Sequence, residues 1–330
     1  MSASSHDEDT ALPQKKKRRN LFDLLYNMGN TKEITEDDRK APRNFAFFFK
    51  LTGRNLGRIF YANLLFLLAN FPIILIALFF AKTFHSPGVT PPSPLFLPLA
   101  GAREFGAVSP DMMTLWGVFG NSATIYFPTV ASWIVLGVGI LLLLFTFGPV
   151  SIGVSYVLRN VVRGEPIFFW KDFWYALKKN LRQGILVGII DLFLSFMLVY
   201  DLLFCFRNLS DFFSGMMFWA TVFMILIYFV MRFYIYLLTL TFDLKIWQIF
   251  KNALIFAFLG FKRNILAFIG TILLIVLNFA VLVVYMPIGI VLPLVITVGL
   301  CMFISIYAAW PKIKEIMIDP YESEEEPDEL

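Results

Sequence analysis

Long apolar blocks alternate with shorter charged segments along most of the chain. Six such blocks lie near residues 59–81, 132–157, 184–206, 216–241, 265–286 and 288–310. Each is long enough to cross about 30 Å of hydrocarbon as an α-helix. The last two together hold about 46 residues, twice the length of one span, so we expect a tight turn at Pro287 between them. The pattern predicts an all-α polytopic membrane bundle with six transmembrane helices.

The composition supports this interpretation. Hydrophobic residues make up 58% of the chain, against about 45–50% in an average soluble domain. The mean hydropathy is +0.72. Because the excess is concentrated in the six blocks, the length of the chain reflects a number of membrane spans rather than a number of soluble domains.

The distribution of lysine and arginine predicts the orientation of the bundle. If the N-terminus lies inside, 24 of the 28 Lys and Arg residues lie on the cytoplasmic side. The outer side has only Lys82, Arg103 and Arg207, and Arg232 lies within a span. This asymmetry follows the positive-inside rule. We therefore expect both termini in the cytoplasm.

Three regions differ in composition. Residues 1–44 form a basic extension in which 1–19 are polar enough to be disordered and 20–28 are amphipathic. The amphipathic stretch suits either an anionic membrane surface or the protein's own cytoplasmic face. Residues 45–311 form the membrane domain, and residues 312–330 form an acidic tail. Since the basic residues flank predicted spans, nucleic-acid binding is not expected.

The segment between the first two spans, about 82–131, is the longest predicted outer loop. It is rich in proline and also carries apolar patches. We expect an ordered coil, with a short re-entrant or surface helix near 110–120 as the alternative.

Three of the spans begin in a similar way. A basic residue, then Asn55, Asn180 or Asn264, then Leu or Ile opens the helix after an amphipathic segment. We expect each asparagine to accept hydrogen bonds from the free N–H groups of the helix start. The repeat predicts three helical hairpins, each preceded by an in-plane cytoplasmic helix. The alternative is that the three helices are anchored at the interface independently.

Charged residues inside the spans are the main candidates for function. Asp191 and Arg232 are each expected about four residues to the cytoplasmic side of the centre of consecutive spans. Because charges at that depth are costly, we predict an intramembrane ion pair between them, either structural or lining a solute or proton path. Asp201 is about 15 Å further along the same helix. The two aspartates are therefore too far apart to form a protease dyad.

Other chemistry finds little support. Cys205 and Cys301 lie far apart within apolar blocks, and His6 and His85 are isolated. No catalytic, metal or cofactor site is predicted. Asn63, Asn70 and Asn278 are expected to make hydrogen bonds between helices.

The second span and the segment after it resemble a known family. The sequence Phe147-Gly148-Pro149-Val150-Ser151-Ile152-Gly153 and its continuation to Asn160, followed by Trp170-Lys171-Asp172-Phe173, resemble the YesL-like bacterial membrane proteins, a family of unknown function. The likeness is strongest over about 45–205 and looser to 312. Physically, Gly148 and Pro149 predict a kink in the second span, since proline removes a helix hydrogen bond. Small residues there allow close approach of another helix.

The resemblance implies an accessory role in carbohydrate uptake in the bacterial cell membrane. We expect a non-enzymatic protein without cofactors, partnered by anionic lipid headgroups and by a sugar ABC transporter or another membrane protein. Its interaction surfaces would be residues 166–182, 244–262 and the tails. The alternative is a small-solute transporter or channel that uses the Asp191 and Arg232 region. A continuous polar cavity there would favour transport, and a dry bundle would favour the accessory role.

Overall fold

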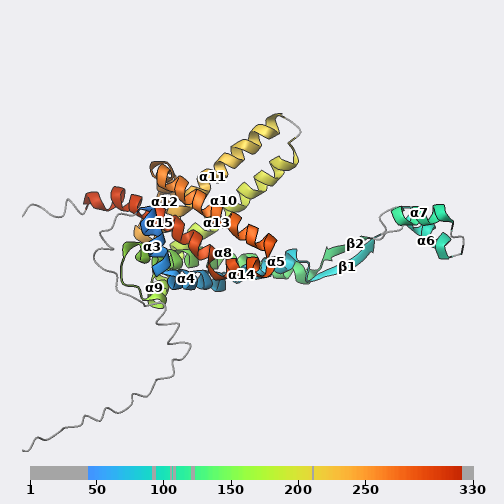
Figure 1. Ribbon diagram of the computed structural model, residues 1–330, viewed down its shortest axis with the longest axis horizontal. Helices are drawn as coiled ribbons and strands as arrows, with labels where there is room; N and C mark the ends of the chain where they lie inside the picture. The colour runs from blue at the N-terminus through green and yellow to red at the C-terminus, as the bar shows by residue number, and fades with distance from the viewer. Residues whose placement is uncertain are drawn as a thin grey trace, which may run out of the picture.

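The computed structural model describes residues 44–321 except 91–93, 105, 107–108, 120–122 and 210–211. The predicted N-terminal extension before residue 44 and most of the acidic tail lie outside the described residues. Within the described part, the fold is a bundle of long helices with one projecting arm (Figure 1). The predicted fold class, an all-α polytopic membrane bundle, is confirmed.

Five helical stretches are long and apolar enough to cross a membrane. Four are single helices: α8 (Val130–Arg163), α10 (Leu181–Arg207), α11 (Phe212–Thr241) and α13 (Phe261–Val284). The fifth runs from Met286 to Tyr321 and contains α14 (Met286–Leu292), the π-helix η1 (Pro293–Thr297) and α15 (Val298–Met317). A sixth span is present if α4 (Leu56–Ala69) and α5 (Pro72–Phe80) count as one.

The first predicted span, 59–81, is not a single straight helix. Helices α4 and α5 are bent by 63° at the break between them. Pro72 opens α5 and has no N–H to continue the ladder of α4. At the end of α4, the backbone N–H and the side-chain amide of Asn70 both donate to Phe66 O, the amide at 2.9 Å. The expectation of one continuous helix was therefore wrong.

The last two spans meet at a tight turn, as expected. Helix α13 ends at Val284 and α14 begins at Met286, so the reversal lies at Tyr285, two residues before Pro287. A Cβ atom on Gly289 would overlap the backbone of Leu282. Glycine at this position therefore lets α14 fold back closely against α13.

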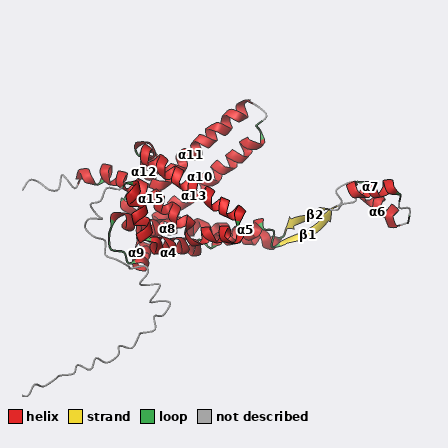
Figure 2. Ribbon diagram, in the orientation of Figure 1, coloured by secondary structure: helices red, strands yellow, loops and turns green. Residues whose placement is uncertain are grey.

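The segment predicted as an outer loop is not a coil, which corrects the leading expectation. Strands β1 (His85–Thr90) and β2 (Ala123–Pro128) pair antiparallel, from His85 opposite Pro128 to Thr90 opposite Ala123. The ribbon projects away from the helices, and α6 (Phe96–Glu104) and α7 (Pro110–Phe119) lie beyond it (Figures 1 and 2). The β-branched and aromatic run in β2 favours a strand. Pro87 is tolerated because both strands of such a ribbon are edges.

Tight packing gathers in one part of the bundle. More than half of the buried apolar residues belong to the second halves of α8 and α11 and to α15, where the chain runs toward its basic segments. The other halves of α8 and α11 are largely exposed, and in Figure 1 the α10–α11 hairpin diverges there from α8. Hydrocarbon is the solvent that suits such exposed apolar helices.

Short helices precede three of the spans: α3 (Phe45–Arg54), α9 (Phe169–Lys179) and α12 (Ile246–Leu259). They fall where amphipathic segments were predicted. No linker separates α3 from α4 or α9 from α10, and a single asparagine, Asn55 or Asn180, lies at each junction. In the third case Gly260 lies between α12 and α13, and Asn264 is inside α13.

The predicted capping role of these asparagines was wrong. Asn55 and Asn180 make no side-chain cap to the helix that follows them. Each instead donates its amide back to the preceding short helix, Asn55 to Leu51 O at 2.9 Å and Asn180 to Ala176 O at 3.1 Å. Their φ values of −116° and −109° with ψ near 18° are not the extended geometry that an N-cap requires. The amide therefore fastens the end of the short helix.

Asn264 closes the third junction through the same kind of bond. Its amide donates to Phe256 O at 3.1 Å and to Ala257 O at 2.9 Å, both near the end of α12. Its oxygen accepts a hydrogen bond from Tyr234 on α11 at 2.6 Å. All three repeat asparagines thus add a side-chain donor to carbonyls in the last turn of the preceding short helix, and the Leu51, Ala176 and Phe256 carbonyls also accept the backbone N–H four residues on.

Helix α8 runs unbroken through Gly148 and Pro149, and its predicted kink stays a prediction. A Cβ on Gly148 would overlap the carbonyl oxygen of Gly184 and lie 2.8 Å from the Cα of Gly188. Helices α8 and α10 therefore touch backbone to backbone. One turn further, Gly153 leaves room for the ring of Phe173 on α9. The small residues do provide the close approach expected of them.

Gly148→Ala should destabilise the fold, because a methyl group cannot enter this contact without separating α8 from α10. We expect a loss of about 1–3 kcal/mol, the usual cost of overpacking. Gly137→Ala, in the same helix but with nothing within 4 Å of the added Cβ, is the matched control and should be neutral or stabilising. Thermal unfolding of the purified protein measures both, and equal melting temperatures would contradict the contact.

Candidate intramembrane cavity

The structure brings Asp191 and Arg232 together. Asp191 lies on α10 and is fully buried, and Arg232 lies on the neighbouring helix α11. Arg232 Nε is 3.0 Å from Asp191 Oδ1 and donates to Oδ2 at 3.2 Å. The predicted pairing partners are thus in direct contact, at a depth where an unpaired charge is costly.

Two tyrosines that the sequence analysis missed complete the environment of Asp191. Tyr228 OH donates to Oδ1 at 2.7 Å, and Tyr236 OH donates to Oδ2 at 2.5 Å. Tyr228, Arg232 and Tyr236 are four residues apart along α11 and so project from one face of the helix. This four-residue spacing, in the span next to the one that carries Asp191, is the sequence pattern from which the two tyrosines could have been identified.

The arrangement leaves the two ends of the ion pair in different surroundings. The Asp191 carboxylate is enclosed and receives three donors. Arg232 has a side chain that is 36% exposed, and within the described residues it reaches its acceptor through Nε alone. The outer nitrogens of the guanidinium, Nη1 and Nη2, therefore remain available to another acceptor.

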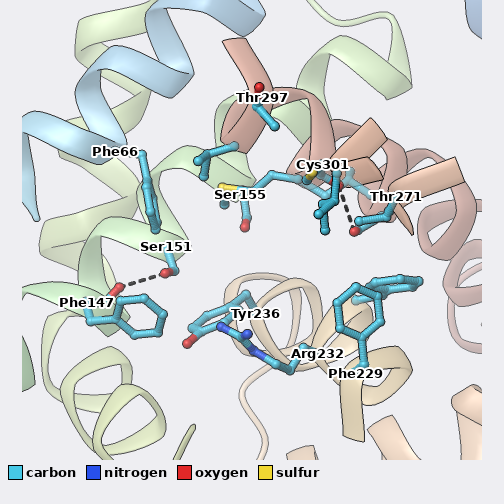
Figure 3. Close-up of a pocket in the computed structure, with 16 residues that line it drawn as sticks. Phe66, Phe147, Ser151, Ser155, Phe229, Arg232, Tyr236, Thr271, Thr297 and Cys301 are labelled. Carbon is cyan, nitrogen blue, oxygen red and sulfur yellow. Dashed lines mark hydrogen bonds between the residues drawn. The ribbon is translucent and has the colours of Figure 1, made fainter. Parts of the chain in front are cut away.

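Arg232 and Tyr236 line a partly open cavity of about 380 Å³ between α4, α8, α11, α13, η1 and α15. Figure 3 shows their side chains between those of Phe147 and Phe229, in the interior of the cavity. Most of the lining is apolar, including Phe66, Phe233 and Met302. The guanidinium is the one charged group among the lining residues.

Hydroxyl groups supply the remaining polarity of the lining. Ser151, Thr271 and Ser305 each donate to a carbonyl four residues back in their own helix, at 2.7–2.9 Å. Their single hydroxyl hydrogens are used, so toward the cavity they offer oxygen acceptors. The outer nitrogens of Arg232 are therefore the strongest donors available to a ligand.

The π-helix η1 shapes the opposite wall. Asn63 on α4 donates to Pro293 O at 3.2 Å and to Leu294 O at 2.7 Å, and it accepts from Gly299 N at 2.8 Å. Asn278 on α13 donates to Thr297 Oγ1 at 2.8 Å, and Thr297 lines the cavity. π-Helical turns occur often at functional sites. Asn63 and Asn278 make the contacts between helices that were predicted, and Asn70 accepts a longer bond of 3.4 Å from Thr146.

A second buried cation was missed because it was assigned to a loop. Arg159 lies in the buried second half of α8 and is 6% exposed. Its guanidinium lies 4.7 Å from the ring centroid of Tyr156 and 5.3 Å from that of Trp310, and Nη1 donates to Thr241 at 3.1 Å. Cation–π contacts with aromatic faces stabilise such a charge. Arg159 therefore joins α8, α11 and α15 as a structural element.

The other candidate residues lie apart from this cavity or play a minor part in it. Asp201 is half-buried further along α10. Cys205 is buried, whereas Cys301 is half-buried and lines the cavity. Within the described ranges, no group of three or more His, Cys, Asp or Glu side chains is placed to hold a metal ion.

A comparison with known families matches part of the chain. The family model described as "Protein of unknown function, DUF624" matches residues 115–202. This segment contains α8, α9 and most of α10, with Gly148, Pro149 and Asp191 but not Arg232. No curated protein and no solved structure matches the chain.

Asp191→Ala should lower stability by about 3–5 kcal/mol, because it leaves Arg232 without its buried partner. Adding Arg232→Ala should restore part of that loss, since no charge then lacks a counter-ion. Unfolding free energies of the wild type, both single variants and the double variant give the coupling energy. Losses that add to within about 0.5 kcal/mol would contradict the pair.

Proposed function

We propose that this integral membrane protein binds a small organic anion in its central cavity and that the cavity is the substrate site of a solute carrier. The observation that carries the proposal is the position of Arg232. Asp191 holds its Nε, while the rest of the guanidinium lies in a cavity with an otherwise uncharged lining. Arginine presents its nitrogens as a planar fork that matches a carboxylate or phosphate.

The buried aspartate supports this use of Arg232 rather than competing with it. Tyr228 and Tyr236 donate two hydrogen bonds to Asp191, so its negative charge does not depend on the guanidinium alone. The ion pair with Asp191 fixes the side chain of Arg232 before any ligand arrives. Pre-positioned groups of this kind lower the ordering cost of binding.

The size and surface of the cavity narrow the class of ligand. A volume of about 380 Å³ lies at the lower end of the usual range for small-molecule sites. Aromatic and aliphatic side chains form most of the lining, which suits a ligand with an apolar body. A sugar needs many directional partners, and here several hydroxyls have already donated to their own helices. We therefore assign the cavity to an anion with an apolar body.

A second candidate function is the accessory role in carbohydrate uptake that the resemblance to YesL-like proteins implies. The exposed aromatic side chains of α9 favour it: Trp170, Trp174 and Tyr175 are each about half exposed. Such a face suits a membrane protein partner or the lipid interface. In this proposal the protein is not an enzyme, lies in a bacterial cell membrane with both termini in the cytoplasm, and presents 166–182 and 244–262 to the partner. Co-purification of a sugar ABC transporter that is lost in Trp170→Ala/Trp174→Ala would favour it.

The anion site is testable through Cys301, which lines the cavity. In a Cys205→Ala background, N-ethylmaleimide labels Cys301 alone. We expect 4-phenylbutyrate to slow this labelling at least tenfold, and its uncharged analogue 4-phenylbutanamide to slow it less than twofold at the same concentration. The reason is that the two compounds have the same shape but only the carboxylate pairs with Arg232.

Two variants control the experiment. Asp191→Asn/Arg232→Gln removes both charges together, so no buried charge lacks a partner, and it should abolish the difference between the two compounds. In Cys301→Ala, labelling of Cys205, which lies outside the cavity, should not respond to either compound. Equal protection of Cys301 by the acid and the amide, or protection by neither, would overturn the anion site. Uptake of labelled 4-phenylbutyrate into proteoliposomes then separates transport from binding.

A further inference from the structure

A second hollow lies on the side of the bundle, away from the central cavity. It has a volume of about 330 Å³ and lies between α3, α13 and α15. Phe45 and Phe49 of α3 form one wall, and Leu300 and Ile304 of α15 form the other. The floor is α13, on which Arg263 occupies the end next to α3. This hollow is called the α13 groove below.

The groove has the length of one membrane leaflet. Along α13 its lining residues recur at helical spacing, Leu266, Gly270, Leu273 and Leu277, so they form one stripe. The stripe covers about 16 Å of helix, close to half of the roughly 30 Å hydrocarbon thickness. An acyl chain of a lipid in one leaflet would lie along its whole length.

The groove is open to the hydrocarbon, and a glycine on α13 leaves space at its base. Phe45, Phe49, Leu266 and Leu273 on its rim are each more than half exposed. A Cβ built on Gly270 meets only Ile304, at 3.9 Å, so open space lies above this glycine. Apolar side chains exposed on both sides of an apolar channel are compatible with a lipid chain between them.

The charge at the end of the groove selects a headgroup. Arg263 lines that end, and Lys262 precedes it in α13. Basic residues beside a membrane-spanning helix attract anionic headgroups.

We propose that the α13 groove is a binding site for an anionic phospholipid, with one acyl chain along Leu266–Leu277 and the phosphate at Arg263. The site is separate from the central cavity, so this inference does not rest on the proposed carrier function. Leaflet length and positive charge at one end of the groove together identify this occupant.

Native mass spectrometry tests the lipid site. The full-length protein is incubated in detergent with equimolar palmitoyl-oleoyl phosphatidylglycerol and phosphatidylcholine, which share their acyl chains. We expect at least threefold more bound phosphatidylglycerol. Gly270→Phe, which fills the groove, should reduce retention of both lipids at least threefold. Arg263→Gln should remove the preference for phosphatidylglycerol, and Arg263→Lys should keep most of it.

Matched controls separate the groove from general effects. Gly137→Phe places the same ring at an open position of α8 outside the groove, and Lys178→Gln removes an exposed cation from α9. Neither should change lipid retention. Equal retention of the two lipids by the wild type would overturn the proposal. So would unchanged retention in Gly270→Phe, measured on protein that unfolds at the wild-type temperature.

Discussion

The enclosure of one carboxylate constrains the middle of this bundle. Asp191 has no contact with solvent, so its lone pairs must be satisfied by the protein. All three side-chain donors come from one face of α11, which fixes the rotation of α11 against α10. Gly184 and Gly188, just before Asp191 on α10, bring α8 into backbone contact. The ion pair and the glycine contact together set the positions of α8, α10 and α11, and so place Arg232 at the cavity.

The junctions between short helices and spans follow from another requirement for hydrogen-bond partners. A helix that ends where the next begins leaves carbonyls without partners, and near hydrocarbon water cannot supply them all. Asn55, Asn180 and Asn264 each add a side-chain amide donor to a carbonyl in the last turn of the preceding short helix, which also accepts a backbone N–H from the end of that helix. The same residue type therefore appears at three similar places because one geometric problem is repeated. This physical role explains the repeat whether or not the short helices lie in the membrane plane.

Features that depend on burial and on the spacing of residues could be predicted from the sequence. The apolar blocks predicted the fold class, and the depth of Asp191 and Arg232 in consecutive spans predicted which residues meet. The direction of the asparagine bonds was not predictable, because a carboxamide both donates and accepts and the backbone angles decide between them. The break at Pro72 lay inside a block whose composition did not change. The two tyrosines were overlooked, although their spacing places them on the face of Arg232.

The central cavity and the α13 groove could not be predicted from the sequence, for a different reason. Each is bounded by helices distant in sequence, and its volume depends on how side chains such as Phe147 and Phe229 fill the space between them. No periodicity along a single helix contains that information. The same holds for η1, where Asn63 compensates the carbonyls of Pro293 and Leu294 from 230 residues away. A π-helical turn depends on contacts with residues that are distant in the sequence, so the local sequence does not specify it.

The distribution of packing also bears on how a ligand would reach Arg232. Buried polar bonds, such as those of Arg159 and Asn264, join the helices at the basic end of the bundle. Toward the opposite end the α10–α11 hairpin diverges from α8 (Figure 1), and many of the side chains along it are exposed and apolar, available for apolar contacts. In a lipid environment such contacts exchange with lipid chains at little cost, because lipid tails are as apolar as the side chains. Movement of the hairpin at that end would open the cavity while leaving the polar junctions intact, so binding and release need not disturb the contacts that hold the fold.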